Sequence, residues 1–251
     1  MMEFIIPDWP GLPPNIGAIS TLRAGGVSQS PYDNGSGSGG LNLGAHVGDR
    51  LPDVLQNRLL LQASLPDQPK WLTQVHGSEV VDAATVVGAP EADASFCTQV
   101  GVVCAILTAD CLPVLFCDEH GRVVAAAHAG WRGLVGGVLE NTVASMRKSG
   151  AGKILAWLGP AIGPTHFEVG KEVMEAFIAR DASTYIAFSP MAGKPEKYLA
   201  NIYLLSKILL QKVDVNEVSG GGLCTVSDTR QFYSYRRDKV TGRMASVIWI
   251  R

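Results

Sequence analysis

Hydrophobic positions along the chain follow the two periods of regular secondary structure, two residues for strands and 3.6 for helices. The strand period predicts strands at residues 79–87, 101–107, 113–117, 123–127, 154–158 and 245–250. The helix period predicts helices at residues 53–63, 134–148, 171–180 and 199–212. Helices therefore flank a strand-rich middle. This order favours an α+β fold with helices covering sheet faces over an all-β sandwich or a helical bundle.

The hydrophobic pattern is interrupted at residues 34–40, which read Asn-Gly-Ser-Gly-Ser-Gly-Gly. A Gly/Ser run buries no apolar surface that could offset the entropy cost of ordering it. We therefore predict a flexible loop, which is either natural or an inserted linker. Because the run is too short and too early to separate two domains, we predict a single domain over residues 1–251.

Composition and charge narrow the classes of partner. Apolar residues make up 47% of the chain and charged residues only 18%, so the chain as a whole is expected to fold. The 21 basic and 23 acidic residues create no global field for nucleic acid or an anionic membrane. No apolar stretch approaches the roughly 20 residues that span a bilayer. We expect a monomer with no nucleic-acid or membrane partner.

The five cysteines indicate a reducing compartment. They are odd in number and contain no C-x-x-C pair, and a chain of 251 residues needs no disulfide staples. The N-terminal segment carries Glu3 and Asp8 and lacks the basic start and apolar core of a secretory signal. We therefore expect a cytoplasmic protein whose thiols are available for catalysis or for a metal.

Polar, reactive residues are concentrated in three short segments where apolar runs end: 73–77, 108–113 and 128–133. Strand ends and the loops after them are where rigid scaffolds present functional groups. Cys111 lies between two predicted strands and His128 ends a third. We predict that a three-strand meander brings them together, with Asp110 and Arg132 beside them.

Two chemistries fit His76, Cys111 and His128 if they converge. Two imidazoles and a thiolate form a zinc site with an open fourth position, which is the catalytic arrangement. Alternatively, Cys111 is a nucleophile and one histidine is its base, which leaves the other histidine unused. Taken singly, each residue also has a structural explanation, such as a buried cysteine, a hydrogen-bonded core histidine or a histidine in a surface turn.

The segment Gly130-Trp131-Arg132-Gly133 precedes a predicted helix, so its N–H groups could bind an anion with Arg132 adding charge. A plain turn explains the glycines equally well. The sequence contains neither the P-loop lysine motif nor a dinucleotide-binding G-x-G-x-x-G after an early strand.

The motifs of the chain closely resemble those of the YfiH family over nearly its whole length. The only clear departure is the Gly/Ser run, which relatives replace by a short passage. The motifs are Gly25-Gly26-Val27-Ser28, Pro31-Tyr32, Leu41-Asn42-Leu43-Gly44, His46-Val47-Gly48-Asp49, Gln74-Val75-His76-Gly77, Ala92-Asp93-Ala94, Thr108-Ala109-Asp110-Cys111-Leu112-Pro113, His128-Ala129-Gly130-Trp131-Arg132-Gly133, Gly159-Pro160-Ala161-Ile162-Gly163 and Ser234-Tyr235-Arg236-Arg237-Asp238.

The resemblance implies a fold, a ligand set and an activity. The fold is a layered α/β/β/α sandwich with mixed sheets, shared distantly with a class of cysteine hydrolases. The metal ligands fall by motif on His76, Cys111 and His128. Family members are described as laccase-type polyphenol oxidases and as purine nucleoside phosphorylases. The implied substrates are adenosine, inosine or methylthioadenosine with phosphate, or phenolic compounds, and adenosine deamination is a further implied reaction.

A conventional multicopper laccase needs more histidine ligands than the five in this chain, which excludes that mechanism. A single copper could still occupy a His2Cys site, because copper binds such ligands more tightly than zinc does. We favour zinc and purine nucleoside chemistry. For this chemistry we expect Arg23 and Arg132 to hold phosphate, Asn42 and Gln74 to place the nucleoside, and Asp110 to carry a proton or orient ligands.

Overall fold

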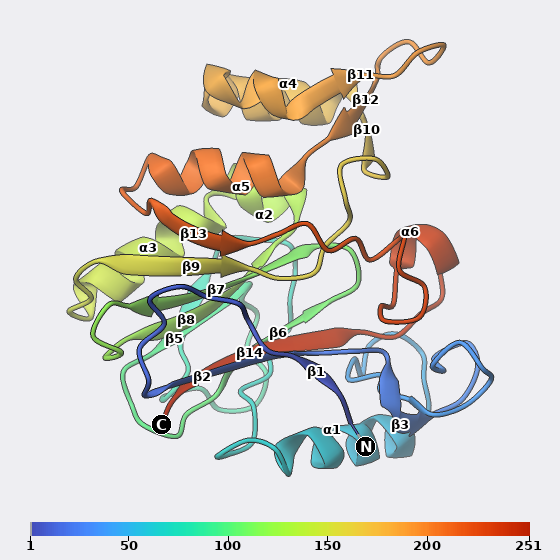
Figure 1. Ribbon diagram of the computed structural model, residues 1–251, viewed down its shortest axis with the longest axis vertical. Helices are drawn as coiled ribbons and strands as arrows, with labels where there is room; N and C mark the ends of the chain where they lie inside the picture. The colour runs from blue at the N-terminus through green and yellow to red at the C-terminus, as the bar shows by residue number, and fades with distance from the viewer. Residues whose placement is uncertain (1) are drawn as a thin grey trace.

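The computed structural model describes residues 2–251, and two stacked β-sheets form its centre (Figure 1). The first sheet is antiparallel and joins the C-terminal strand to strands from the start and the middle of the chain. In sheet order its strands are β1 (Phe4–Ile5), β2 (Ile16–Thr21), β14 (Met244–Ile250) and β6 (Cys104–Thr108). Because β14 lies between β2 and β6, the sheet is complete only when the end of the chain is in place.

The second sheet is mixed. In sheet order its strands are β13 (Glu217–Gly220), β9 (Ile154–Leu158), β7 (Leu112–Asp118), β8 (Val124–Ala129), β5 (Ala94–Cys97) and β4 (Val80–Asp82). The outer pairs β13/β9 and β4/β5 are parallel, and the inner pairs are antiparallel. The mixed α+β class predicted from the periodicity is confirmed.

Helices and a small third sheet complete the described part of the chain. The third sheet has the order β10 (Glu168–Gly170), β12 (Lys197–Ala200), β11 (Phe188–Pro190), and β3 (Ala24–Ser28) packs on the first helix. The helices are α1 (Leu51–Gln62), α2 (Trp131–Gly136), α3 (Val138–Lys148), α4 (Lys171–Arg180), α5 (Ile202–Gln211) and α6 (Tyr235–Asp238), with a 3-10 turn at Ala182–Ala187.

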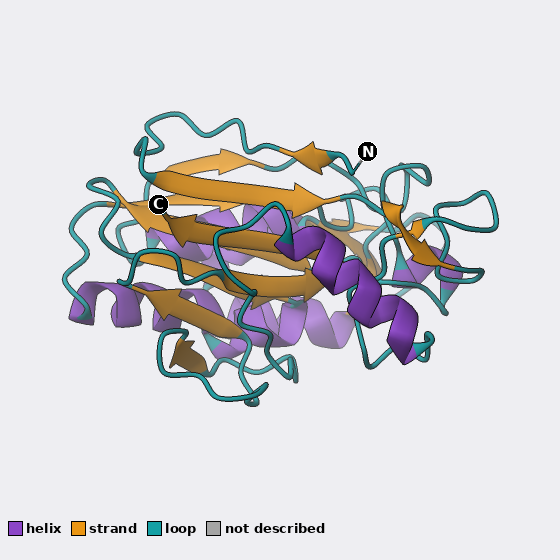
Figure 2. Cartoon of the chain, turned by 90° about the horizontal axis from the view of Figure 1, so that it is seen from below, coloured by secondary structure: helices purple, strands orange, loops and turns teal. Residues whose placement is uncertain are grey.

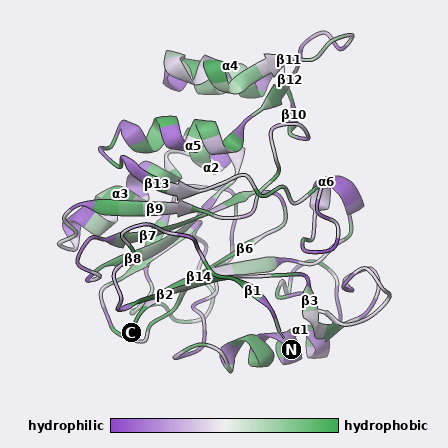
Figure 3. Ribbon diagram, in the orientation of Figure 1, coloured by the Kyte–Doolittle hydropathy of each residue, from purple (hydrophilic) through white to green (hydrophobic). Residues whose placement is uncertain are grey.

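The elements form layers, because each face of the two sheets is apolar and must be covered. Helix α1 lies below the first sheet and α5 lies above the second, with α3 packed on the same face of the second sheet as α5 (Figure 1). In Figure 2, which is seen from below, one helix crosses in front of the strands and the others lie behind them. Along β7, Val114 faces the helices and Leu115 faces the first sheet. Central strands such as β9 are therefore hydrophobic along their whole length (Figure 3), as expected of strands buried on both faces.

The helix predictions hold in type and differ at their ends. The helix at 171–180 is present as α4. The predicted helix 134–148 is divided into α2 and α3 at Gly137, whose φ of 93° ends the first helix. The predicted start at 199 is wrong: that residue belongs to β12, and α5 begins after Asn201, whose side chain accepts a hydrogen bond from the N–H of Leu204.

The predicted strand 79–87 is mostly wrong, because only β4 is extended. After it the chain turns, and Asp82 holds the turn by accepting a hydrogen bond from the N–H of Ala84 at 2.9 Å. The predicted three-strand meander is also wrong. Strand β6 pairs with β14 in the first sheet, whereas β7 and β8 form a hairpin in the second. The chain crosses between the sheets at residues 109–111, between the end of β6 and the start of β7.

The Gly/Ser run at 34–40 is a loop, as predicted, and side chains at its start hold its backbone. The carboxylate of Asp33 accepts a hydrogen bond from Gly35 N, and the side chain of Asn34 accepts one from Ser36 N. The flexibility of this loop stays a prediction.

Candidate active site

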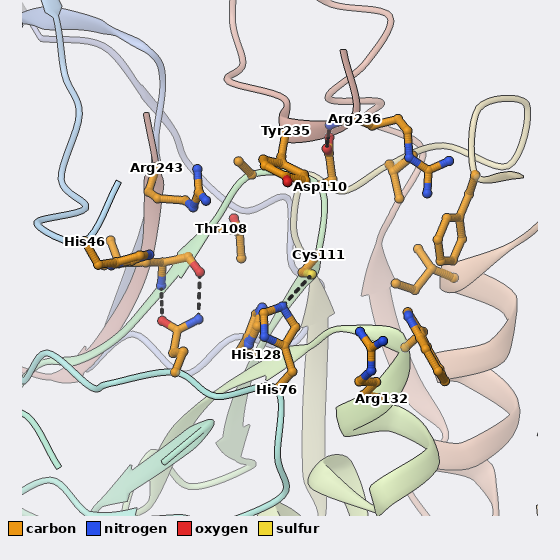
Figure 4. Close-up of a pocket in the computed structure, with 17 residues that line it drawn as sticks. His46, His76, Thr108, Asp110, Cys111, His128, Arg132, Tyr235, Arg236 and Arg243 are labelled. Carbon is orange, nitrogen blue, oxygen red and sulfur yellow. Dashed lines mark hydrogen bonds between the residues drawn. The ribbon is translucent and has the colours of Figure 1, made fainter. Parts of the chain in front are cut away.

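Three predicted ligands converge at the ends of separate elements (Figure 4). One ligand atom from each of His76, Cys111 and His128 can be chosen so that all three lie within 4.8 Å of one another. The Cys111 sulfur lies 3.8 Å from Nε2 of His76. His128 is buried, Cys111 is half-buried and His76 is exposed. The site is therefore anchored in the sheet and open on one side.

The β7–β8 hairpin places Cys111 beside His128. Its register pairs Pro113 with His128 and Leu112 with Ala129, so the turn residue Cys111 lies next to the end of β8. After β8, Gly130 begins α2. A Cβ atom at position 130 would lie 3.1 Å from both the Cys111 sulfur and the His76 ring, so a side chain there would crowd the three ligands.

Asp93, directly before β5, positions both histidines. Its carboxylate accepts hydrogen bonds from the backbone N–H groups of Val75, His76 and Gly77, which fixes the loop that carries His76. The same carboxylate lies 2.7 Å from Nδ1 of His128. A protonated Nδ1 leaves Nε2 of that ring free as a ligand, which is the carboxylate–histidine arrangement of many zinc sites.

Cys111 and His128 stabilise each other's charged forms. Burial opposes ionisation of the Cys111 thiol, but the charge of His128 and hydrogen bonds from His128 and His76 outweigh it and lower the pKa to about 6. Burial also opposes protonation of His128, yet the Cys111 thiolate and the Asp93 carboxylate raise its pKa above the ordinary value. The site thus carries a thiolate at neutral pH, which is the form that binds metals and reacts as a nucleophile.

The three side chains fit a tetrahedral metal ion. Zinc bonds of about 2.0 Å to nitrogen and 2.3 Å to sulfur put neighbouring ligand atoms about 3.5 Å apart. The observed separation of 3.8 Å between Cys111 and His76 is close to this value. Two neutral nitrogens and one thiolate suit zinc and also copper. Three protein ligands leave one position of a tetrahedron open.

We expect the Cys111 thiol of metal-free protein to react with iodoacetamide almost as fast at pH 7 as at pH 8. An ordinary thiol, with a pKa near 8.5, is only a few per cent ionised at pH 7. Because the pKa of Cys111 is lowered, its reactivity should be lost only as the pH falls through about 6. Peptide mass spectrometry measures the rate at each cysteine, with the fully buried Cys104 and Cys117 as internal controls. A midpoint above pH 8 for Cys111 would contradict the proposed ion pair.

The three ligands line a cavity of about 560 Å³, large enough for a small organic substrate. Aromatic and aliphatic side chains form much of its wall. Positive charge comes from three arginines, and the one carboxylate among the lining residues of the described chain belongs to Asp110. The other lining residues are His46, Gln74, Leu107, Thr108, Ala109, Trp131, Arg132, Ile162, Phe167, Ile202, Tyr235, Arg236 and Arg243.

Two predicted site residues line this cavity with their polar atoms already bonded. One oxygen of Asp110 accepts from the Thr225 hydroxyl at 2.6 Å, and the other accepts from Arg236 N at 2.6 Å. The Gln74 amide pairs with both backbone groups of Leu107. These contacts favour an orienting role for Asp110 over the role of a proton carrier. The contacts of Gln74 anchor its side chain to the end of β6.

Two other predicted residues lie outside the cavity lining. Arg23 is buried and forms an ion pair with Asp33 at 3.3 Å, so its charge is already neutralised and it does not reach the cavity. Asn42 is fully buried, and its side chain bonds to Asp49, Gly44 and Arg243 N. Both residues hold the loops around the cavity. Arg132 lines the cavity as predicted, with its guanidinium stacked on the ring of Trp131.

Sequence reasoning missed the contacts of Asp93 with the histidines and the position of Arg243 in the cavity lining. Asp93 lies in the Ala92-Asp93-Ala94 motif. A single carboxylate between two alanines was the one sequence feature that could have indicated a buried functional residue there. Arg243 lies in a short turn before the C-terminal strand, and nothing in its local sequence points to the cavity. Cys97, Cys104 and Cys117 are buried, as the default for strand cysteines predicts.

Fold and site together define a mixed α+β protein with a His2Cys group at the wall of a positively charged cavity. The chain belongs to the YfiH family: the family model described as multi-copper polyphenol oxidoreductase laccase matches residues 17–251. The chain is 51% identical to a purine nucleoside phosphorylase of Pseudomonas aeruginosa and to the purine nucleoside phosphorylase YfiH of Escherichia coli, with each comparison covering the full length of both proteins.

A solved structure agrees with the fold. A crystal structure of a Neisseria meningitidis protein is 46% identical, covers 98% of both chains and superposes with a TM-score of 0.90. Within residues 2–251, no helix combines the length and the apolar character that a membrane span requires.

Proposed function

We propose that the protein is a metal-dependent purine nucleoside phosphorylase that acts on adenosine, inosine or methylthioadenosine. One observation supports this proposal most strongly: the His76–Cys111–His128 group lies in the same cavity as several arginines and aromatic rings. Aromatic rings can stack a purine, and arginines bind phosphate. The names of the relatives in Pseudomonas and Escherichia support the same activity.

In the proposed reaction, a phosphate oxygen forms a bond to the anomeric carbon of the ribose. The bond from that carbon to the purine nitrogen breaks, its electron pair leaves with the base, and the base takes up a proton. His76, Cys111 and His128 would hold a zinc ion, which when bound would act as a Lewis acid. Arg132 is placed to contact the phosphate or the nucleoside, and Asp110 orients the turn that carries Cys111.

Incubating adenosine or inosine with the zinc form of the protein should yield free base and pentose phosphate only when phosphate is supplied. Chromatography of the products, with and without phosphate, measures this directly. Adenosine deamination, which is a further part of the proposal, would appear as inosine or hypoxanthine. Release of free ribose without phosphate, or no turnover of any purine nucleoside, would contradict phosphorolysis.

The second candidate is a phenol oxidase with copper in the same site, as the name of the matching family model indicates. Copper has the redox couple that phenol oxidation requires, and zinc has none. The matched control is therefore the same protein loaded with copper and assayed on a phenolic dye. If only the copper form has activity, and only on phenols, the oxidase is the better description.

The third candidate function is that of a hydrolase with a catalytic Cys–His dyad. This candidate also includes the proposal that the fold is of the cysteine hydrolase type. The separation of 3.8 Å between Cys111 and His76 is compatible with it. It requires metal-free protein to be active and Cys111 to be trapped by an alkylating agent. We also propose that the protein acts as a single-domain monomer in the cytoplasm, where the five free thiols stay reduced.

A further inference from the structure

Arg243 is a half-buried cation at one end of the cavity, and it forms no ion pair with any of residues 2–251. Burial lowers the pKa of its guanidinium, and the negative charges of Cys111 and Asp110 offset this effect only in part. Arg23 provides the contrast, because its buried guanidinium has a carboxylate partner in Asp33. A charge withdrawn from water without a partner costs free energy, so such an arginine commonly serves an anionic ligand.

The protein holds Arg243 in one position. Its Nη1 donates to the carbonyl oxygens of Thr241 and Gly242, each at 3.0 Å. Its backbone N–H donates to Asn42 Oδ1 at 2.9 Å, and a Cβ atom on Gly44 would lie 2.8 Å from Cγ of Arg243. The buried amide of Asn42 and the missing side chain of Gly44 therefore fix the arginine stem. Nε and Nη2 have no acceptor within the described chain and remain available to a ligand.

Thr108, at the end of β6, is the second observation. The residue is only 3% exposed, yet its hydroxyl forms no hydrogen bond with residues 2–251. The buried hydroxyls of Thr142 and Thr225 are bonded to protein oxygens, whereas that of Thr241 has no partner and is enclosed by the protein. Figure 4 shows the hydroxyl of Thr108 and the guanidinium of Arg243 facing the same part of the cavity, between His46 and Tyr235. A hydroxyl that is open to a cavity and has no protein partner is available to a polar group of a ligand.

We infer that Arg243 and Thr108 form an oxyanion subsite that binds a phosphate group beside the His76–Cys111–His128 group. The guanidinium contributes charge and two donors, and the hydroxyl contributes a third donor, which suits a tetrahedral dianion. Both oxygens of Asp110, the one carboxylate in the lining, accept hydrogen bonds from Thr225 and Arg236 N, so neither oxygen pairs directly with Arg243. The inference rests on the proposed phosphorolysis for its biological meaning, but the subsite can be tested without turnover.

The phosphate group can come from inorganic phosphate or from the 5′-phosphate of a nucleotide. Isothermal titration of the intact protein with inorganic phosphate, with adenosine and with adenosine 5′-monophosphate separates these sources. We expect inorganic phosphate to bind by itself. Arg243→Gln should weaken this binding by about tenfold or more, the usual size of a lost charged hydrogen bond. Thr108→Val should weaken it by a few-fold, and Thr108→Ser should restore it.

Arg50→Gln is the matched control, because Arg50 is an exposed arginine outside the cavity, and it should leave phosphate binding unchanged. If Arg243→Gln misfolds, the Thr108→Val and Thr108→Ser pair still decides the outcome. Unchanged binding of both inorganic phosphate and adenosine 5′-monophosphate in Arg243→Gln and Thr108→Val would overturn the subsite, as would binding that depends on Arg132 alone. If Arg243 matters only for adenosine 5′-monophosphate, the subsite stands and its phosphate is that of a nucleotide. A protein that binds phosphate at Arg243 but cleaves no nucleoside overturns the proposed function and leaves the subsite.

Discussion

Replacing Cys111 with serine should remove nearly all of the bound zinc and abolish turnover of purine nucleosides. A serine hydroxyl stays protonated at neutral pH, so the variant loses the anionic ligand of a His2Cys site. The remaining two histidines, His76 and His128, offer too few ligands for a stable zinc site. Elemental analysis should find about one equivalent of zinc in the parent protein and almost none in the variant.

The matched control for this change is Cys224→Ser. Cys224 is also a half-buried free cysteine, but it lies outside the three-ligand group, and its sulfur accepts a hydrogen bond from Gly163 N that a serine oxygen can also accept. This variant should keep its zinc. Full metal retention in Cys111→Ser would refute the ligand assignment, and activity of metal-free parent protein would favour the cysteine hydrolase.

Asp93→Asn should weaken both the metal site and the fold around it. The carboxylate accepts three backbone N–H groups and contacts Nδ1 of His128, and an amide cannot accept from all of these donors. Loss of such a partner behind a metal ligand lowers metal affinity by about 10- to 100-fold. A buried donor left unpaired costs about 1–3 kcal/mol of unfolding free energy. Zinc competition titration and chemical denaturation measure the two effects.

Asp118→Asn separates the two effects. Asp118 is equally buried and also accepts backbone N–H groups, from Arg122 and Val123. It lies at the other end of β7 from Cys111, about 23 Å away at 3.3 Å per residue. This variant should lose stability but keep its zinc affinity. Equal zinc affinity in Asp93→Asn and the parent would show that Asp93 does not position the ligands.

Local sequence was sufficient for most elements and for the segments that carry the chemistry. The apolar pattern predicts α4 because one face of this helix is buried, at Val173, Met174 and Phe177. It predicts the central strands β7 to β9 because they are buried along their whole length. The short outer strands β10 to β13 were not predicted. They are only three or four residues long, too short for a period to show.

The three candidate metal ligands were named from sequence, but the contacts that bring them together were not. A meander was predicted, whereas β6 and β7 belong to different sheets and the hairpin of β7 with β8 places Cys111 beside His128. Strand pairing depends on contacts between distant segments, which a local period does not record. The third ligand, His76, reaches the site through the carboxylate of Asp93.

The sequence by itself determined the α+β class, the candidate ligands and a folded chain without a global charge preference. Only the tertiary structure decided which polar residues face the cavity and which form hydrogen bonds or ion pairs that stabilise the fold. Arg23 and Asn42 are held by Asp33 and by the loop that carries Arg243, while Arg243 itself opens onto the cavity. The physical reason is that a polar group is available to a ligand only if no distant part of the chain has already satisfied it.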